Sequence, residues 1–237
     1  MPRLVCISDT HLEHGKLVVP EGDILVHAGD LTMMGSVPEV GRATLWLEQA
    51  KAAGKFRHVV VIPGNHDWLA ERDPGTMRAM VEAAGAIYLQ HQPAVVMGLR
   101  FFGSGYTPAF MGWALNVARG PRLAYLWSQI PDDTEVLVTH GPPRRILDSV
   151  TRYDLGDRAY DHMNDKWLDG CSGDTRGESM GCAALAHRVK TLLDLKLHVF
   201  GHRHRSGLVV KDDVTYANAS VVSESYILTY PPQVIDL

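Results

Sequence analysis

The chain has 237 residues, 46% of them hydrophobic, and no linker-like Pro, Gly or Ser tract, so we expect a single domain over residues 1–237 with a substantial core. A formal net charge of -4 argues against a protein that holds nucleic acid mainly by a basic surface, and nucleic acid remains only as a substrate. The three cysteines lie far apart without a CxxC pair, which excludes a disulfide framework and a thiolate metal site.

No apolar run approaches the length that crosses a membrane, and the first predicted strand begins at Leu4, which leaves no room for an apolar signal segment. We therefore expect a cytoplasmic protein that does not contact membranes. The sequence does not indicate the oligomeric state.

The first predicted strand, residues 4–7, is a short apolar run of the kind that fills the buried centre of a sheet. Asp9 and His11 follow it. Residues two apart on an extended chain project from the same side, so this carboxylate and imidazole can converge on one metal ion. An Asp and a His after a strand are also common as a turn residue and a surface histidine, so the pair alone does not define a site.

Four later apolar runs also end in polar residues, which strengthens the metal hypothesis. These runs cover residues 23–30, 57–62, 135–139 and 197–200. With the first strand they supply oxygen and imidazole groups and no thiolate: Asp9, His11, Asp30, Asn65, His140, His202 and His204. This set exceeds the needs of one ion, and an aspartate shared between two ions fits a binuclear site for Mn²⁺, Fe or Zn²⁺.

The remaining elements alternate in a way that predicts an α/β sheet with crossover helices. Helices are predicted from the capping pair Ser36 and Glu39 to Gly54, over 74–84, 121–128 and 182–193, and short strands over 86–89 and 94–102. The last segment, residues 207–236, reads as a meander of strands with a turn at Asp212 and Asp213.

Two polar segments interrupt this pattern. The Gly-punctuated loop 103–120 carries aromatic residues, Trp113 among them, which either plug the edge of the core or contact a substrate. The Asp- and Gly-rich insertion at about 151–181 is either a lid or a solvated loop.

Five short motifs, DTH at residues 9–11, GD at 29–30, GNHD at 64–67, HG at 140–141 and GHRH at 201–204, occur in this order after predicted strands. Together they resemble the signature of the calcineurin-like metallophosphoesterase superfamily. The segments HAGDLT, VTHGPP and PPQVIDL extend the resemblance to the MPPED-type metallophosphoesterases over almost the whole chain except the insertion. The resemblance implies a four-layer αββα sandwich, with two mixed β-sheets flanked by helices.

The resemblance also implies two divalent metal ions, with Mn²⁺ as the first expectation and Fe or Zn²⁺ as alternatives. One ion would be held by Asp9, His11, Asp30 and His204, and the other by Asp30, Asn65, His140 and His202, with Asp30 bridging. His66 would stand beside the leaving group and donate a proton or a hydrogen bond. Asp67 is the candidate to orient His66, although a structural role for Asp67 at the start of the next turn is an alternative.

The activity implied by the resemblance is hydrolysis of small phosphodiesters by direct attack of a metal-bridging hydroxide, with cyclic nucleotides as the suggested substrate class. Alternatives are a nuclease or a phosphomonoesterase with the same metal site, or a weakly active metal-binding scaffold. The intact His204 of the last motif argues against the scaffold, because a decayed site would be free to lose ligands.

Overall fold

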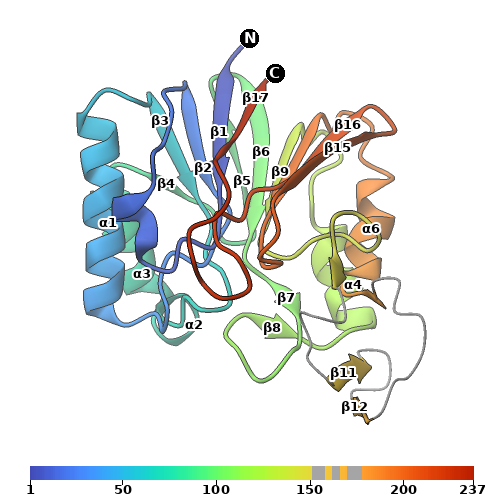
Figure 1. Ribbon diagram of the computed structural model, residues 1–237. Helices are drawn as coiled ribbons and strands as arrows, with labels where there is room; N and C mark the ends of the chain where they lie inside the picture. The colour runs from blue at the N-terminus through green and yellow to red at the C-terminus, as the bar shows by residue number, and fades with distance from the viewer. Residues whose placement is uncertain (151–157, 162–165, 170–177) are drawn as a thin grey trace.

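The computed structural model describes residues 1–150, 158–161, 166–169 and 178–237 (Figure 1). The insertion predicted at about 151–181 lies largely outside these residues. Its described parts include a short antiparallel pair, β11 (Arg158–Asp161) with β12 (Lys166–Asp169).

Two mixed β-sheets form the centre of the molecule, as expected from the resemblance. The first sheet has the order β17-β1-β2-β3-β4, with β1 (Arg3–Ile7), β2 (Ile24–His27), β3 (His58–Val61) and β4 (Ile87–Tyr88) parallel, and β17 (Gln233–Asp236) antiparallel to β1. The second has the order β15-β16-β14-β9-β6-β5, formed by Gly207–Lys211, Val214–Asn218, Leu197–Phe200, Val136–Thr139, Leu99–Ser104 and Gln92–Val96.

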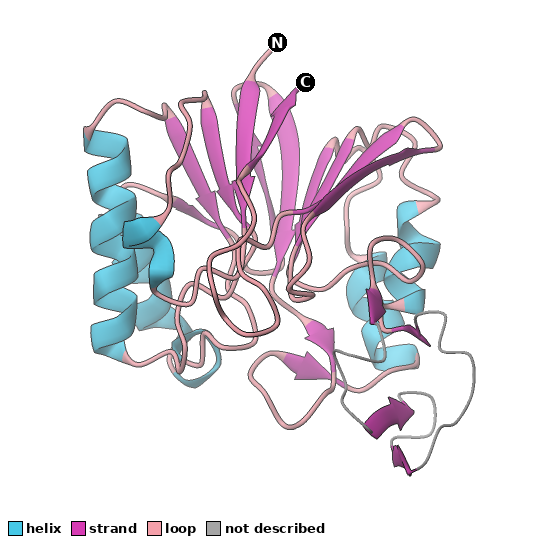
Figure 2. Ribbon diagram, viewed as in Figure 1, coloured by secondary structure: helices cyan, strands magenta, loops and turns pink. Residues whose placement is uncertain are grey.

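Helices cover the outer face of each sheet, which gives the four layers (Figure 2). On the first sheet lie α1 (Val37–Ala52) and α3 (Pro74–Ala83), and on the second lie α4 (Pro121–Ser128) and α6 (Ala183–Val189). The 3-10 helix η1 (Glu13–Lys16) and the short α2 (Leu69–Arg72) lie in loops of the first half. The capping box predicted at Ser36 and Glu39 is confirmed, because both of its hydrogen bonds are present. Within the described residues, none of the helices has the length and apolar character needed to cross a membrane.

The alternation of side chains along β1 explains why its sequence is apolar without interruption. Val5 and Ile7 pack in the core between the first sheet and its helices, whereas Leu4 and Cys6 pack in the core between the two sheets. A strand buried on both faces needs apolar residues at every position. A third core, which includes Trp127 of α4, fills the space between the second sheet and its helices.

Three expectations about secondary structure need correction. Residues 207–236 do not form one meander, because β15 and β16 pair in the second sheet whereas β17 joins the first. The loop 103–120 contains the end of β6 and a parallel pair, β7 (Thr107–Pro108) with β8 (Asn116–Val117). Helix α6 ends at Val189, where hydrogen bonds of the i to i+3 type tighten the chain before β14.

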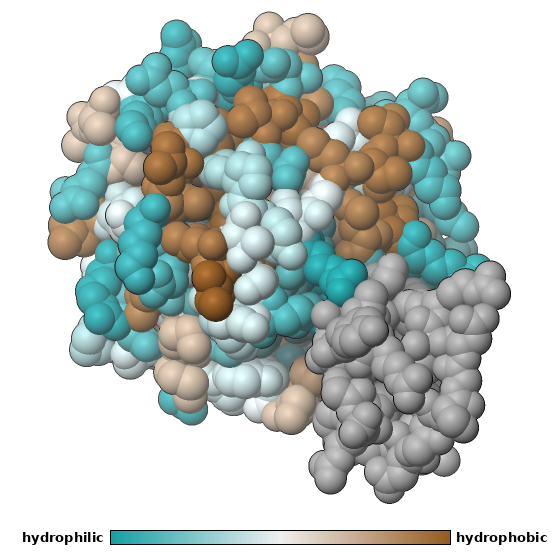
Figure 3. Space-filling view, in the orientation of Figure 1, coloured by the Kyte–Doolittle hydropathy of each residue, from teal (hydrophilic) through white to brown (hydrophobic). Residues whose placement is uncertain are grey.

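Among the strands that the structure describes, the outer strand β15 pairs with β16 alone, and it exposes apolar side chains on the face seen in Figure 3. Leu208 is 48% exposed and Val210 is 69% exposed. The hairpin turn that follows is tight, because Asp212 and Asp213 both adopt positive φ, as the predicted turn requires. Lys211 flanks the exposed edge with a charge, a common protection against pairing with another chain.

One prediction about stability concerns His198, in the middle of β14. Its side chain is fully buried beside the Thr139 hydroxyl, and burial lowers its pKa to about 3, from 6.5 in an exposed chain. The depressed pKa favours the neutral form, so the stabilisation is present above pH 6.5 and is lost as the pH falls from 6.5 toward 3. Between about pH 7 and pH 5 this histidine alone should cost about 2 kcal/mol.

Urea unfolding of the wild type and of His198→Gln at both pH values measures this cost. Because all other titrating groups are shared, the wild type should lose about 2 kcal/mol more than the variant on acidification. Equal losses in the two proteins would contradict the burial argument.

Candidate metal centre

The candidate ligands come together at the carboxyl ends of strands from both sheets. Parallel strands end at the same edge of a sheet, and in Figure 1 the loops after β1, β2, β3 and β9 lie together at the lower ends of the two sheets. β14 is parallel to β9, so the loop after it ends at the same edge. These loops carry all seven predicted ligands: Asp9, His11, Asp30, Asn65, His140, His202 and His204.

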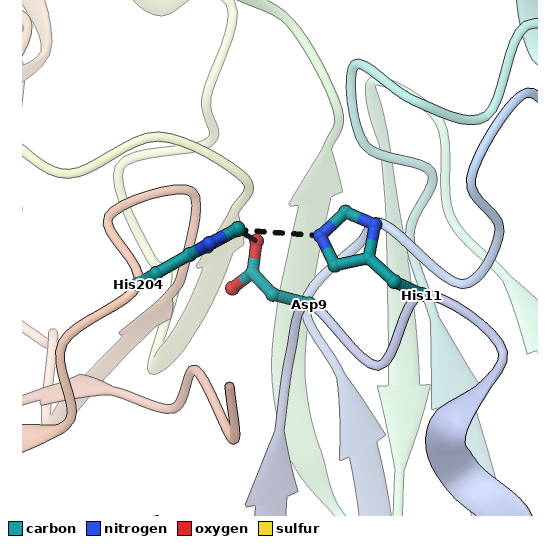
Figure 4. A group of neighbouring side chains, drawn as sticks. All are labelled: Asp9, His11 and His204. Carbon is teal, nitrogen blue, oxygen red and sulfur yellow. Dashed lines mark hydrogen bonds and ion pairs between the residues drawn. The ribbon is translucent and has the colours of Figure 1, made fainter. Parts of the chain in front are cut away.

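Asp9, His11 and His204 form one cluster (Figure 4), with ligand atoms within 4.8 Å of one another. Nε2 of His11 lies 3.2 Å from Nε2 of His204, and Nε2 of His204 lies 3.7 Å from Oδ1 of Asp9. Figure 4 shows the two rings pointing toward one another from opposite sides of the carboxylate. The three residues are buried. Two imidazoles and a carboxylate that face one point form a suitable partial shell for a divalent cation.

A second cluster adjoins the first through Asp30. Its Oδ2 lies 3.2 Å from Nε2 of His140 and 3.8 Å from Nε2 of His11. Oδ1 of Asn65 lies 2.9 Å from Nε2 of His140 and 2.7 Å from Nδ1 of His202. The position of Asp30 between the clusters is the one that a shared ligand needs.

Backbone carbonyls fix which nitrogen of three histidines faces the clusters. Nδ1 lies 3.1 Å from the Thr32 carbonyl in His11, 2.9 Å from the Ala28 carbonyl in His140 and 3.1 Å from the Ser223 carbonyl in His204. A carbonyl only accepts hydrogen bonds, so Nδ1 carries the proton. Nε2 of a neutral ring then keeps its lone pair for a metal ion.

The charges of the clusters also suit a cation. Burial lowers the pKa of His11 to about 4 and that of His204 to about 3, so both rings are neutral near pH 7. Burial also opposes charging of His140, but the carboxylates of Asp30 and Asp9 outweigh it and raise its pKa to about 9. The carboxylates that raise this pKa favour positive charge at His140, and a cation bound there would take the place of the proton.

The backbone at the clusters is strained. Asp9, Asp30 and His202 have φ values of 55°, 56° and 65°, in the left-handed region that costs about 1 kcal/mol or more for a residue other than glycine. The motif glycines allow close approach. A Cβ at Gly64 would lie 2.2 Å from Oδ1 of Asp30, and one at Gly201 would lie 2.2 Å from Oδ2 of Asp9. Strain and close packing of this kind are typical of functional sites.

His66 lies beside the first cluster, but its ring partner differs from the one expected. Nδ1 of His66 lies 2.7 Å from the carbonyl of Met33, and the His11 ring stands edge-on with centroids 4.7 Å apart. Asp67 does not take the expected position against the ring. Its fully buried carboxylate accepts hydrogen bonds from the backbone N–H groups of Leu31, Thr32 and Gly64 and from the Thr32 hydroxyl.

The hydrogen bonds of Asp67 favour the structural alternative, with any effect on His66 passing through the neighbouring loop. Its carboxylate accepts from the backbone N–H groups of Leu31 and Thr32, the two residues before Met33, so it holds the loop that presents the Met33 carbonyl to His66. Burial raises the pKa of Asp67 to about 6, with the charge of Asp30 adding to the effect. Asp67 thus contacts His66 through a loop and not through its own oxygens.

Two further aromatic residues adjoin the clusters. The Tyr226 ring lies 4.8 Å from the rings of both His11 and His204, and its pKa is raised by burial and by the nearby carboxylates. The Trp113 ring stacks on His66 with centroids 4.1 Å apart. Tyr226 lies in a segment without a motif, so no signal in the sequence singles it out. Trp113 lies in the loop 103–120, whose aromatic residues are expected from the sequence either to pack on the core or to contact a substrate.

Comparisons with known proteins agree with the geometry. The sequence model of a family described as "Calcineurin-like phosphoesterase" matches residues 2–206, a range that includes all seven candidate ligands. Metallophosphoesterase domain-containing protein 1 of Homo sapiens, and likewise of Mus musculus, is 32% identical over 257 residues, covering 99% of this chain and 71% of that protein. The crystal structure of Phosphopantetheinyl Hydrolase (PptH) from Mycobacterium tuberculosis superposes with a TM-score of 0.53 at 18% identity, covering 94% of this chain and 90% of that one, and shows a shared fold.

Proposed function

The chain belongs to the calcineurin-like phosphoesterase family, and we propose that within this family it is a phosphodiesterase that uses two divalent cations to hydrolyse small phosphodiesters. The observation that carries the proposal is the pair of clusters joined at Asp30, whose Oδ2 faces His140 on one side and His11 on the other. One cluster would hold each ion.

The cations would supply Lewis acidity, a water of lowered pKa and positive charge for the phosphate oxygens. The chain supplies the rest. Asp9, Asp30, Asn65 and the four imidazoles would hold the ions, and the carbonyls of Thr32, Ala28 and Ser223 orient three of these imidazoles. His66 binds the Met33 carbonyl through Nδ1, so its Nε2 is the atom that would give a proton or a hydrogen bond to the departing oxygen.

The proposal also names a substrate class and a metal. Small phosphodiesters, with cyclic nucleotides among them, are the first expectation, and Mn²⁺ is the expected metal. Oxygen and imidazole ligands without thiolate are compatible with Mn²⁺, Fe and Zn²⁺. Location in the cytoplasm stays a prediction from the sequence.

The experiment is a substrate panel on the purified protein loaded with Mn²⁺, Fe²⁺ or Zn²⁺. It compares bis-p-nitrophenyl phosphate, p-nitrophenyl phosphate, 3′,5′-cyclic nucleotides and single-stranded DNA. The diesters should be hydrolysed faster than the monoester. Preference for the monoester throughout would indicate a phosphomonoesterase, preference for DNA a nuclease, and no turnover with any metal a metal-binding scaffold; each of these results would overturn the proposal.

Metal removal gives a second prediction. Dialysis against a chelator should reduce diester hydrolysis to background, and addition of Mn²⁺ should restore it, because the proposed mechanism depends on the cations to activate water and to bind the phosphate oxygens. Far-UV circular dichroism should change little on metal removal, since apolar cores on both sides of each sheet stabilise the fold without the cations. Full activity in the chelated protein would contradict the metal-dependent mechanism.

A further inference from the structure

We propose that Trp113 is a positioning residue, which holds the His66 imidazole in the orientation that catalysis needs. The inference rests on the proposed function, because His66 matters only if an ester bond is broken beside it. It assigns a role to the loop 103–120, whose aromatic residues are consistent with either core packing or substrate contact on sequence alone.

The His66 ring is held on three sides. Trp113 stacks on one face with centroids 4.1 Å apart and an angle of 28° between the rings. His11 stands edge-on to the ring at 4.7 Å and 79°, and the Met33 carbonyl lies 2.7 Å from Nδ1. The carbonyl alone would allow the ring to swing about the Nδ1 hydrogen bond. A stacked indole removes that freedom, because rotation would drive the imidazole into its face.

The loop that carries Trp113 is itself fixed to the elements around His66. The N–H of Ala114 donates to the carbonyl of Asn65 at 3.2 Å, and the N–H of Leu115 donates to the carboxylate of Glu71 in α2 at 2.6 Å. Ala114 is fully buried and Leu115 is 5% exposed, both in the core between the first sheet and its helices. Trp113 and His66 are therefore anchored to the same short stretch of chain.

Hydrogen bonds also close the loop upon itself. β7 pairs with β8, and Oδ1 of Asn116 accepts from the N–H of Phe110 at 2.7 Å. Nδ2 of Asn116 donates to the Thr107 hydroxyl and to the Ala114 carbonyl, each at 3.1 Å. A loop with this many internal bonds presents Trp113 as a fixed wall and not as a mobile lid.

The test uses the dependence of a proton donor on the leaving group, because only a basic leaving group needs a proton. Methyl p-nitrophenyl phosphate releases a stable anion that needs no proton, whereas methyl phenyl phosphate releases a more basic phenolate that does. Trp113→Ala should lower kcat for the phenyl ester by about 10²-fold, since misplacement of a catalytic group by about 1 Å costs that much. It should lower kcat for the p-nitrophenyl ester by less than about threefold. Trp113→Phe, which keeps a stacking ring, should recover most of the phenyl ester activity.

A double-mutant cycle with His66→Ala separates positioning from general damage. If Trp113 acts through His66, Trp113→Ala should have no further effect on phenyl ester hydrolysis in the His66→Ala protein. Met111→Ala is the matched control, because Met111 lies two residues away in the same loop and is 67% exposed. It should leave both rates unchanged.

The results distinguish the inference from the proposed function. A wild type that hydrolyses neither ester with any metal refutes the proposed function. If the wild type hydrolyses both esters, two results refute the positioning role and leave the proposed function standing. One is that Trp113→Ala lowers kcat equally for the two esters. The other is that the losses of phenyl ester activity from Trp113→Ala and His66→Ala add up in the double variant. A bound Mn²⁺ content equal to that of the wild type shows that the metal centre of Trp113→Ala is intact.

Discussion

Replacing Asp30 with Asn will cost the protein both bound cations and about 10³-fold or more of its diester hydrolysis. Asp30 has one carboxylate oxygen, Oδ2, that lies against imidazoles of both clusters, at 3.2 Å from Nε2 of His140 and 3.8 Å from Nε2 of His11. Its carboxylate carries the negative charge that the two ions would share. Two cations a few ångströms apart repel one another, so loss of that charge weakens both sites together.

Asn is the informative substitution because it keeps the shape of the side chain. Oδ1 of Asp30 accepts a hydrogen bond from the N–H of His66 at 2.8 Å, and the amide oxygen of Asn can still accept it. Oδ2, which faces His140, becomes a nitrogen that donates and cannot bind a cation. The variant should therefore fold, with a circular dichroism spectrum like that of the wild type.

Elemental analysis after loading with Mn²⁺ and desalting measures the outcome. We expect two ions per chain in the wild type and fewer than one in Asp30→Asn. Asp9→Asn should retain one ion, because the second cluster keeps its own side chains, with Asp30 against His140 and Asn65 against both His140 and His202. Asp236→Asn, which removes a charge from a surface ion pair with Arg3, should retain both. Two ions in Asp30→Asn would refute the shared-ligand arrangement.

The sequence predicts that the candidate ligands lie together because each of them follows a strand, and the structure does bring them together. Each ligand follows an apolar run, an apolar run of this length forms a buried strand, and parallel strands end at one edge of a sheet. Asp9 and Asp30 illustrate this, since β1 and β2 pair in parallel and bring the two loops side by side. The same reasoning holds for His140 and His202, which follow β9 and β14.

The pattern of apolar and polar residues does not predict which backbone atoms form hydrogen bonds, nor which neighbouring strand a given strand pairs with. The residue that bonds His66 is Met33, and it does so through a carbonyl that every residue possesses, so its side chain gives no signal. Asp67 was the better guess from chemistry, yet its oxygens are taken by N–H groups and a hydroxyl of neighbouring loops. Likewise, the apolar pattern of β17 predicts a strand but does not indicate which of two sheets it joins.

Replacing His66 with Ala should reduce kcat for a phenyl or alkyl diester by about 10²- to 10⁴-fold, the range for loss of a general acid. The fixed orientation of the ring supports this role. With Nδ1 bound to the Met33 carbonyl and one face against Trp113, Nε2 is the atom left to meet the leaving oxygen. The loss should be much smaller for a p-nitrophenyl ester, whose anion departs without a proton.

The geometry also defines the competing role, because a nitrogen of His66 lies within 4.8 Å of ligand atoms of His11 and Asp30. If His66 were a ligand of the first ion, His66→Ala would lose metal, and the rate loss would be similar for good and poor leaving groups. If His66 is the proton donor, His66→Ala should keep both ions, and only the hydrolysis of esters with poor leaving groups should slow. His58→Gln is a suitable control, since His58 begins β3, at the opposite end of that strand from the loop that carries Asn65 and His66, and should change neither readout. Measuring Mn²⁺ content and the two rates on one preparation decides between the roles. Loss of a metal ligand lowers the rate together with the bound metal, whereas loss of a proton donor lowers the rate according to the basicity of the leaving group.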